Sequence, residues 1–266
     1  MTYLQEILDS HRQKAQNDNR NFESLYKQAS DLPPVREFRK SLIKNSEAGI
    51  AVIAEIKRRS PSKGNLFEEL DPRLLAMEYE SAGAAAISVL TDADHFGGSK
   101  QDLIEASRNV KIPVLRKDFT VDQRDICDAR IMGADAVLLI VSALDEFELK
   151  DFFNLSIELN LDPLVEVHDE KELERALSIG AKLIGVNQRD LKSFEVDPLR
   201  AVDLISKIPE SVTAVAESGI DGAENARKMM EAGYSALLVG ELLVKSADRT
   251  KTLSDLRNTF HERMDD

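Results

Sequence analysis

Apolar runs separated by amphipathic stretches set the pattern of this chain. Four runs belong to a recurring phrase in which a glycine ends a helical stretch and an apolar segment follows, at residues 81–90, 131–140, 178–187 and 231–240. Glycine suits the end of a helix because it adopts the left-handed conformation without a steric penalty. The apolar segments do not alternate with polar residues, so the phrase predicts strands that are covered on both faces.

Further apolar runs lie at residues 50–57, 112–115, 162–167 and 211–216, which brings the candidate strands to eight. Segments with helical spacing of apolar residues, such as 171–177 and 222–230, lie between them. Eight strand-and-helix units over roughly 220 residues are what a (β/α)8 barrel needs. The sequence therefore predicts the α/β class and a single TIM barrel. The structural alternative, an open doubly wound sheet, usually has a G-x-G-x-x-G turn after its first strand, and that turn is missing here.

The first residues of the chain are not required by a barrel. We expect one domain over residues 1–266, with an N-terminal helical extension at 1–48 and the barrel at 49–266. Residues 3–15 carry apolar side chains on one helical face, and a helical pattern resumes over 35–43 after two prolines. These extra helices either close one end of the barrel or take part in closure over a substrate.

Composition narrows the class of protein. Of 266 residues, 42% are hydrophobic, and 48 acidic residues against 35 basic residues give a net charge of −13. This charge disfavours binding to nucleic-acid phosphates, and no apolar run is long enough to cross a bilayer. The single cysteine excludes an internal disulfide framework, and the charged, amphipathic start does not read as a secretory leader. We expect a cytoplasmic protein that binds neither nucleic acid nor membrane.

Charged and amide side chains follow several of the predicted strands. In a barrel the carboxyl ends of all strands meet at one mouth, where the active site lies. The candidates at these ends are Glu55, Lys57, Arg116, Lys117, Asp118, Phe119, Glu166, Asn187, Arg189, Glu217, Ser218, Gly219, Gly240 and Glu241. Each charge taken alone fits a structural ion pair, but their coincidence at one end predicts a catalytic mouth and leaves the reaction open.

Glycines after the last two predicted strands indicate a ligand class. The loops after strands seven and eight of such barrels commonly bind phosphate through backbone N–H groups, and Ser218-Gly219 and Gly240-Glu241 occupy those positions. Simple turn chemistry is the alternative. If phosphate binds here, the Glu241 carboxylate is expected to point away from it.

Patterns for a metal or an activated nucleophile are weak. Asp92, Asp94 and His95 include possible ligands, but no second histidine lies at ligand spacing, and we expect no metal. Cys127 lies in a helical stretch without a His or Lys pattern that would mark an activated thiol, and is expected in the core. We interpret His168, at or beyond the end of its strand, as a rim residue.

Several segments together resemble the indole-3-glycerol-phosphate synthase family, whose members are barrel enzymes of the tryptophan pathway. They are AEIKRRSPSKG (54–64), LTDADHFGGS (90–99), LRKDF (115–119), EVHDEKEL (166–173), GVNQRDLKSFEVD (185–197) and AESGI (216–220). The segments follow the family's order, and the N-terminal extension is also typical of the family.

The resemblance implies ring closure of 1-(2-carboxyphenylamino)-1-deoxyribulose 5-phosphate to indole-3-glycerol phosphate, with loss of carbon dioxide and water and without a cofactor. It implies that Lys117 is the general acid that protonates the ribulose carbonyl, and that Glu166 is its partner base or electrostatic stabiliser. Lys57 and Glu55 resemble the second acid and base, used in substrate binding and dehydration, and Asn187 resembles the residue that positions these groups.

The resemblance also implies which residues contact the substrate. Ser60 and Arg189 match polar contacts, and the apolar pocket for the anthranilate ring is matched by Phe96, Phe119, Leu138 and Leu191. Ser218, Gly219, Gly240 and Glu241 fall on the family's phosphate site, where Glu241 replaces the serine of some relatives. Which lysine serves which proton transfer is left open.

Two other functions remain as alternatives. One is a Schiff-base aldolase, in which Lys57 or Lys117 attacks a carbonyl as a free amine. The other is a barrel that only binds a phosphorylated metabolite. For the partners we expect a small phosphorylated substrate and a monomer or a weak homo-oligomer.

Overall fold

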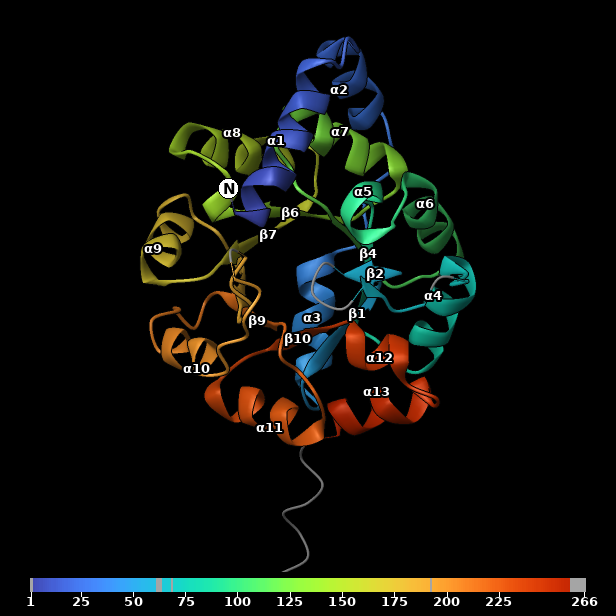
Figure 1. Cartoon of the computed structure of the whole chain (residues 1–266), viewed down its shortest axis with the longest axis vertical. Coiled ribbons are helices and arrows are strands. Elements are labelled where there is room, and N and C mark those ends of the chain that lie inside the picture. Colours follow the sequence, from blue (N-terminus) through green and yellow to red (C-terminus); the bar gives the residue numbers. More distant parts are fainter. Residues whose placement is uncertain (1, 61–63, 68, 192, 259–266) are drawn as a thin grey trace, which may run out of the picture.

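Eight parallel strands form a closed barrel, and helices surround it (Figure 1). The computed structural model describes residues 2–60, 64–67, 69–191 and 193–258. Around the barrel the strands follow the order β1-β10-β9-β8-β7-β6-β5-β4, and a short hairpin, β2-β3, lies outside it. The prediction of a (β/α)8 TIM barrel is confirmed. Pro61, Ser62, Lys63 and Lys192 of the motifs, and the predicted barrel range beyond 258, lie outside the described residues.

The barrel strands are β1 (Ala51–Ile56), β4 (Ala86–Leu90), β5 (Val114–Lys117), β6 (Ala136–Ile140), β7 (Asp162–Val167), β8 (Leu183–Asn187), β9 (Thr213–Glu217) and β10 (Ala236–Val239). The hairpin pairs β2 (Arg59–Ser60) with β3 (Gly64–Asn65). The helices after β1 are α4 (Pro72–Ser81), α5 (Ala93–Phe96), α6 (Lys100–Asn109), α7 (Gln123–Met132), α8 (Glu146–Glu158), α9 (Glu170–Ser178), α10 (Arg200–Ile205), α11 (Ala223–Ala232), α12 (Glu241–Lys245) and α13 (Arg249–Arg257), with a 3-10 turn, η1 (Val141–Ala143), after β6.

The recurring glycine phrase forms the same joint each time. Its four glycines all have positive φ, between 86° and 113°. In each joint the residue after the glycine donates its backbone N–H to the carbonyl five residues earlier, at 2.9 to 3.2 Å. This bond satisfies a carbonyl at the end of the helix and turns the chain into the next strand. The strands that follow are buried on both faces, as predicted.

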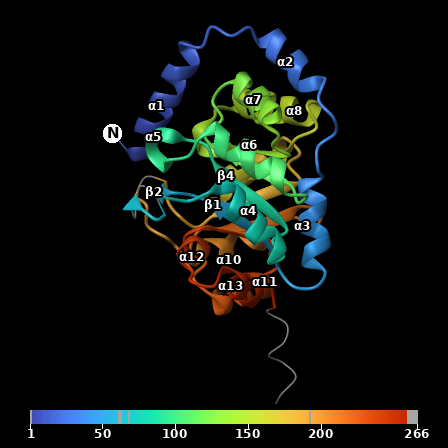
Figure 2. The ribbon, with the colours of Figure 1, turned by 90° about the vertical axis from the view of Figure 1, so that its right-hand side faces the viewer.

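The N-terminal extension reaches both ends of the barrel. It consists of α1 (Tyr3–Gln16), α2 (Phe22–Ser30) and α3 (Phe38–Ser46), and it runs along one side of the barrel (Figure 2). Helix α3 closes the amino-terminal end, because Phe38 and Leu42 are fully buried and the Arg39 backbone N–H donates to Asp162 at the start of β7. Helix α1 lies at the opposite end, where Arg12 pairs with Glu148 at 2.7 Å.

Two details of the extension differ from the prediction. The second predicted helix begins at Phe38 rather than at 35, because the Arg36 backbone N–H bonds the Asp135 carboxylate at 2.7 Å and holds that stretch extended. Helix α2 was not predicted; it begins with a side-chain cap from Asn21. No helix in the described part of the chain has the length and apolarity of a membrane span.

Candidate active site

A cavity of about 820 Å³ lies at the carboxyl ends of the barrel strands. Every residue that the sequence analysis assigned to catalysis or substrate binding lines it: Glu55, Lys57, Ser60, Phe96, Lys117, Phe119, Leu138, Glu166, Asn187, Arg189, Leu191, Ser218, Gly219, Gly240 and Glu241. The barrel thus brings together residues that are up to 186 positions apart between Glu55 and Glu241.

A lysine between two carboxylates occupies the centre of the cavity. Nζ of Lys117 lies 3.0 Å from Oε2 of Glu166 and 3.5 Å from Oε2 of Glu217. These residues come from β5, β7 and β9, which are alternate strands of the barrel, and Glu55 comes from β1, the remaining strand of that set. Alternate strands fill one layer of a TIM barrel with four side chains. Here four charged side chains converge where bulky apolar residues are usual.

The pKa values of the central groups diverge. Burial alone would lower the pKa of Lys117, but the charges of Glu166 and Glu217 outweigh it and raise that pKa. Burial alone would raise the pKa of Glu166, but Lys117 and His168 outweigh it and bring the value to about 2. For Glu217, burial raises the pKa, Lys117 lowers it and Glu166 raises it, with a result of about 8. At pH 7 the centre therefore holds an ammonium, a carboxylate and a mostly protonated carboxyl group.

Glu166 is held from two further sides. The Asn187 side-chain amide donates to Oε1 of Glu166 at 3.1 Å. Nε2 of His168 lies 3.4 Å from the same oxygen, and its Nδ1 lies 3.0 Å from Glu172. Burial alone would lower the pKa of His168, but Glu172 and Glu166 outweigh it and raise the pKa. His168 follows the last residue of β7, as interpreted, but its partly exposed side chain, at 11%, faces Glu166.

A second lysine and carboxylate form a separate pair. Lys57 donates to Glu55 across one face of β1, as the period-2 geometry of a strand requires. Gly240, at the end of the neighbouring strand β10, leaves room for this pair. A Cβ atom at that position would overlap the Glu55 carboxylate and lie 3.1 Å from Nζ of Lys57.

The loops after β9 and β10 form one end of the cavity. Ser218 and Gly219 both have positive φ, 62° and 69°, so the backbone makes a tight turn directly after Glu217. Gln188 fixes this turn by donating to the Ser218 carbonyl at 2.8 Å, and Asn225 donates to the Gly219 carbonyl at 3.1 Å. Such fixed turns direct backbone N–H groups toward an anion.

Glu241 follows this turn at the start of α12. Its carboxylate accepts a bond from Nζ of Lys245, 2.7 Å away, and Lys245 also lines the cavity. The pair places the Lys245 cation beside the Glu241 carboxylate, at the end of the cavity assigned to the phosphate.

Apolar side chains line the cavity beside the central lysine. Phe119 and Leu138 are almost completely buried, at 8% and 2% exposed, while Phe96 and Leu191 are partly buried. Arg189 closes this side through a bond from its guanidinium to the Phe194 carbonyl at 2.8 Å. One cavity therefore combines an apolar side, a charged centre and a polar turn, which suits an aromatic ring joined to a phosphorylated chain.

Two residues at or near the site, Glu217 and His11, were not selected from the sequence. Glu217 was seen at a strand end but not selected, although it meets the same criterion as Glu166: a charge at the end of an otherwise apolar strand. His11 was not connected with the site because it lies 81 positions before Asp92, and only the folded chain brings the two side chains to 3.0 Å. Cys127 is buried in α7, as expected.

A model of the indole-3-glycerol phosphate synthase family matches residues 4–256 of the chain. The chain belongs to this family. Among curated relatives, the indole-3-glycerol phosphate synthase of Chlorobaculum tepidum is 44% identical over 250 residues, which cover 93% of this chain and 97% of the relative. The corresponding protein of Koribacter versatilis is 45% identical over 255 residues, with 95% and 98% covered.

A solved structure is similar in fold. It is the thiamine phosphate pyrophosphorylase from Pyrococcus furiosus, with a TM-score of 0.58, 18% sequence identity, and coverage of 81% of this chain and 96% of that chain. At this identity the likeness concerns the barrel alone, because one barrel fold hosts many chemistries.

Proposed function

We propose that this cavity closes the indole ring of indole-3-glycerol phosphate, with Lys117 as the proton donor. Membership of the family makes the chain a carbon–carbon lyase of tryptophan biosynthesis. The observation that carries the residue assignment is the position of the Lys117 ammonium between Glu166 and Glu217 inside the cavity. The substrate is 1-(2-carboxyphenylamino)-1-deoxyribulose 5-phosphate.

In the first step the aromatic carbon attacks the ribulose carbonyl, and a carbon–carbon bond forms. The electron pair of the carbonyl moves to its oxygen, which takes a proton from Nζ of Lys117. The neighbouring glutamates, Glu166 first, raise the pKa of Lys117, so the group is an ammonium before the reaction. The attacking ring becomes a cation delocalised onto the aniline nitrogen, and the Glu166 carboxylate stabilises it.

Decarboxylation follows without an external electron acceptor. The carbon–carboxylate bond breaks, carbon dioxide leaves, and the electron pair returns to the cationic ring. Dehydration then removes one proton and donates another to the departing hydroxyl group. Glu55 and Lys57 suit these two roles, because they form a second acid and base pair that lines the same cavity.

The remaining residues bind the two ends of the substrate. The anthranilate ring lies against Phe96, Phe119, Leu138 and Leu191, and Ser60 and Arg189 supply polar contacts near this part of the cavity. The phosphate is bound by the backbone at Ser218, Gly219, Gly240 and Glu241, with the Glu241 side chain turned to Lys245. Asn187 is a positioning residue, since it fixes the Glu166 carboxylate.

We also make proposals on the domain organisation, cellular location and oligomeric state. We infer that residues 1–266 act as one domain, because α1 and α3 contact the two ends of the barrel. We further propose a cytoplasmic protein that acts on its small phosphorylated substrate as a monomer or a weak homo-oligomer.

The Schiff-base alternative is less well supported by the electrostatics. A lysine that attacks a carbonyl must be a neutral amine. Lys117 has a raised pKa, which favours its ammonium form, and the Lys57 amino group is engaged by Glu55. Borohydride reduction in the presence of substrate is therefore expected to leave no covalent lysine adduct, and an adduct detected by mass would support the aldolase instead.

The direct test is incubation of the purified protein with the carboxyphenylamino ribulose phosphate, followed by mass identification of the product. The chain contains no tryptophan, so indole fluorescence appears against a low background. We expect indole-3-glycerol phosphate and carbon dioxide in equal amounts. Tight substrate binding without turnover would support the binding-only alternative and contradict the proposal.

A further inference from the structure

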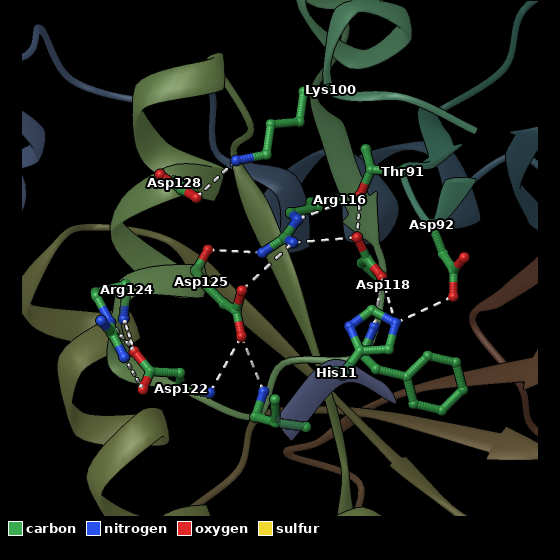
Figure 3. A network of polar contacts seen from close by, with 12 residues as sticks. His11, Thr91, Asp92, Lys100, Arg116, Asp118, Asp122, Arg124, Asp125 and Asp128 are labelled. Atoms are coloured by element: carbon green, nitrogen blue, oxygen red, sulfur yellow. Dashed lines mark hydrogen bonds and ion pairs between the residues drawn. The ribbon is translucent and has the colours of Figure 1, made fainter. Parts of the chain in front are cut away.

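Two histidines and an aspartate meet at the rim of the barrel. Nε2 of His11, in α1, lies 3.0 Å from Oδ2 of Asp92, and Nδ1 of His95, in α5, lies 2.8 Å from the same oxygen. The three donor atoms all lie within 4.8 Å of one another. The site therefore joins the N-terminal extension to the segment after β4, and Figure 3 shows how His11 faces Asp92 and Asp118. His11 is not recognisable from the sequence as a second histidine of this cluster, because it lies 81 positions before Asp92.

The two distances from the histidine nitrogens to the shared Asp92 oxygen are compatible with ligands on one metal ion. Neighbouring ligands with bonds of about 2.1 Å lie about 3.0 Å apart in octahedral and about 3.4 Å apart in tetrahedral geometry. The two nitrogen–oxygen distances, 3.0 and 2.8 Å, lie close to these values. Two imidazoles and one carboxylate form a common ligand set for divalent transition metals, which imidazole nitrogens prefer to Mg²⁺ or Ca²⁺.

Charge also favours a cation at this point. The Asp92 side chain is only 1% exposed, and the ion-pair partners found for it among the described residues are His11 and His95. The nearby cation Lys14 pairs with Asp94 and not with Asp92. A buried carboxylate needs a compensating positive charge, and a neutral imidazole does not provide one.

A neighbouring network holds the site in place. Asp118 lies 3.8 Å from Nε2 of His11, but it already accepts bonds from Arg116, Thr91 and the Phe119 backbone N–H (Figure 3). We therefore count Asp118 as a supporting charge rather than a ligand. Access from solvent remains open, because the histidine side chains are 11% and 17% exposed and Asp92 borders the cavity.

We propose that His11, Asp92 and His95 bind one divalent transition-metal ion of the Zn²⁺ type, with water in the remaining positions. The ion ties α1 to the segment after β4, beside the apolar side of the cavity. Binding requires each coordinating nitrogen to be unprotonated, with the proton of the neutral imidazole on the other ring nitrogen. The site is separate from the proposed chemistry at Lys117, so it stands or fails independently of the reaction.

The test is metal titration of the full chain, purified without a histidine tag and treated with a chelator. Co²⁺ serves as the spectroscopic probe, and Zn²⁺ competition and calorimetry give the affinity. We expect one ion per chain, with visible Co²⁺ absorption that Zn²⁺ abolishes. His11→Gln and His95→Gln should each weaken binding at least about a hundredfold, since even the loss of an outer-shell partner costs about 10- to 100-fold.

Two control variants separate the site from other metal binding. Lys14→Met removes the α1–α5 ion pair but no ligand, and His168→Gln removes a histidine at another place; both should bind Co²⁺ as the unmodified chain does. Zn²⁺ should raise the melting temperature of the unmodified chain and not that of His95→Gln. Absence of saturable binding up to about 1 mM metal, the affinity class of weak sites, would overturn the proposal. Binding by the His11 and His95 variants as tight as that of the unmodified chain would also overturn it.

Discussion

Replacement of Glu217 by glutamine tests the electrostatics of the charged centre. The amide has the shape of the protonated carboxyl group but cannot ionise. Burial is the main reason that the pKa of Glu217 rises from 4.5 to about 8. At about 1.4 kcal/mol per pKa unit, full ionisation of this side chain costs the folded state on the order of 5 kcal/mol.

The sign of the effect on stability follows from linkage. The pKa of Glu217 is higher in the folded chain than in the unfolded chain, so between these two values the folded chain binds more protons. The contribution of Glu217 to the free energy of unfolding is therefore fully present below about pH 4.5 and is lost as the pH rises through about 8. The variant lacks this loss. We expect Glu217→Gln to be close to the unmodified chain at pH 5 and more stable by a few kcal/mol at pH 9.

Urea unfolding at pH 5, 7 and 9 measures the difference. Glu224→Gln is the matched control, because Glu224 is exposed on α11 and its pKa is lowered by Lys228, so its replacement should give no gain at high pH. In a pH profile, the turnover of the unmodified chain should also fall above about pH 8, and this fall should be absent in Glu217→Gln. Parallel stability curves for the variant and the unmodified chain from pH 5 to 9 would refute the reasoning.

Three further predictions concern turnover. Lys117→Ala should lower kcat at least about a hundredfold, the range for a lost general acid, with circular dichroism and unfolding curves confirming a folded chain; near-full activity would remove its assignment. Gly240→Ala should lower kcat because the new Cβ overlaps the Glu55 carboxylate, whereas Gly222→Ala meets no atom within 4 Å and should be silent in the same assay. Lys245→Met should raise KM severalfold at unchanged kcat, since it removes a cation that lines the cavity beside the phosphate; equal KM values would contradict this.

The barrel could be predicted because its strongest determinants are local. The helix-glycine-strand phrase needs only the left-handed glycine and the apolar run after it, and both are visible in the sequence. Boundaries depended on tertiary contacts: α3 begins at Phe38 because Asp135 captures the backbone of Arg36. Pattern alone gives no information on such a partner about one hundred residues away in the chain.

The location of the site was predictable for a similar reason. Parallel strands all point their carboxyl ends to one mouth, so polar residues at those ends must meet. The sequence did not indicate which side chains contact one another at these ends. It showed neither that Lys117 lies between Glu166 and Glu217 nor that the His168 side chain faces Glu166. Side-chain direction at the last residue of a strand depends on twist and on the next loop, and neither follows from the apolar pattern.

The charged centre also explains an otherwise unfavourable use of the barrel interior. The layer formed by β1, β5, β7 and β9 usually holds branched apolar side chains, but here it holds three carboxyl groups and one ammonium. Lys57 neutralises Glu55 and Lys117 neutralises Glu166, which leaves Glu217 without a full counter-charge. Glycines on intervening strands make room for these groups, since a Cβ at position 185 would overlap Glu217 and one at position 240 would overlap Glu55. The charged groups in this layer therefore lower the stability of the fold. In return, the site has one carboxyl group that is protonated at neutral pH, Glu217, beside one that is ionised, Glu166.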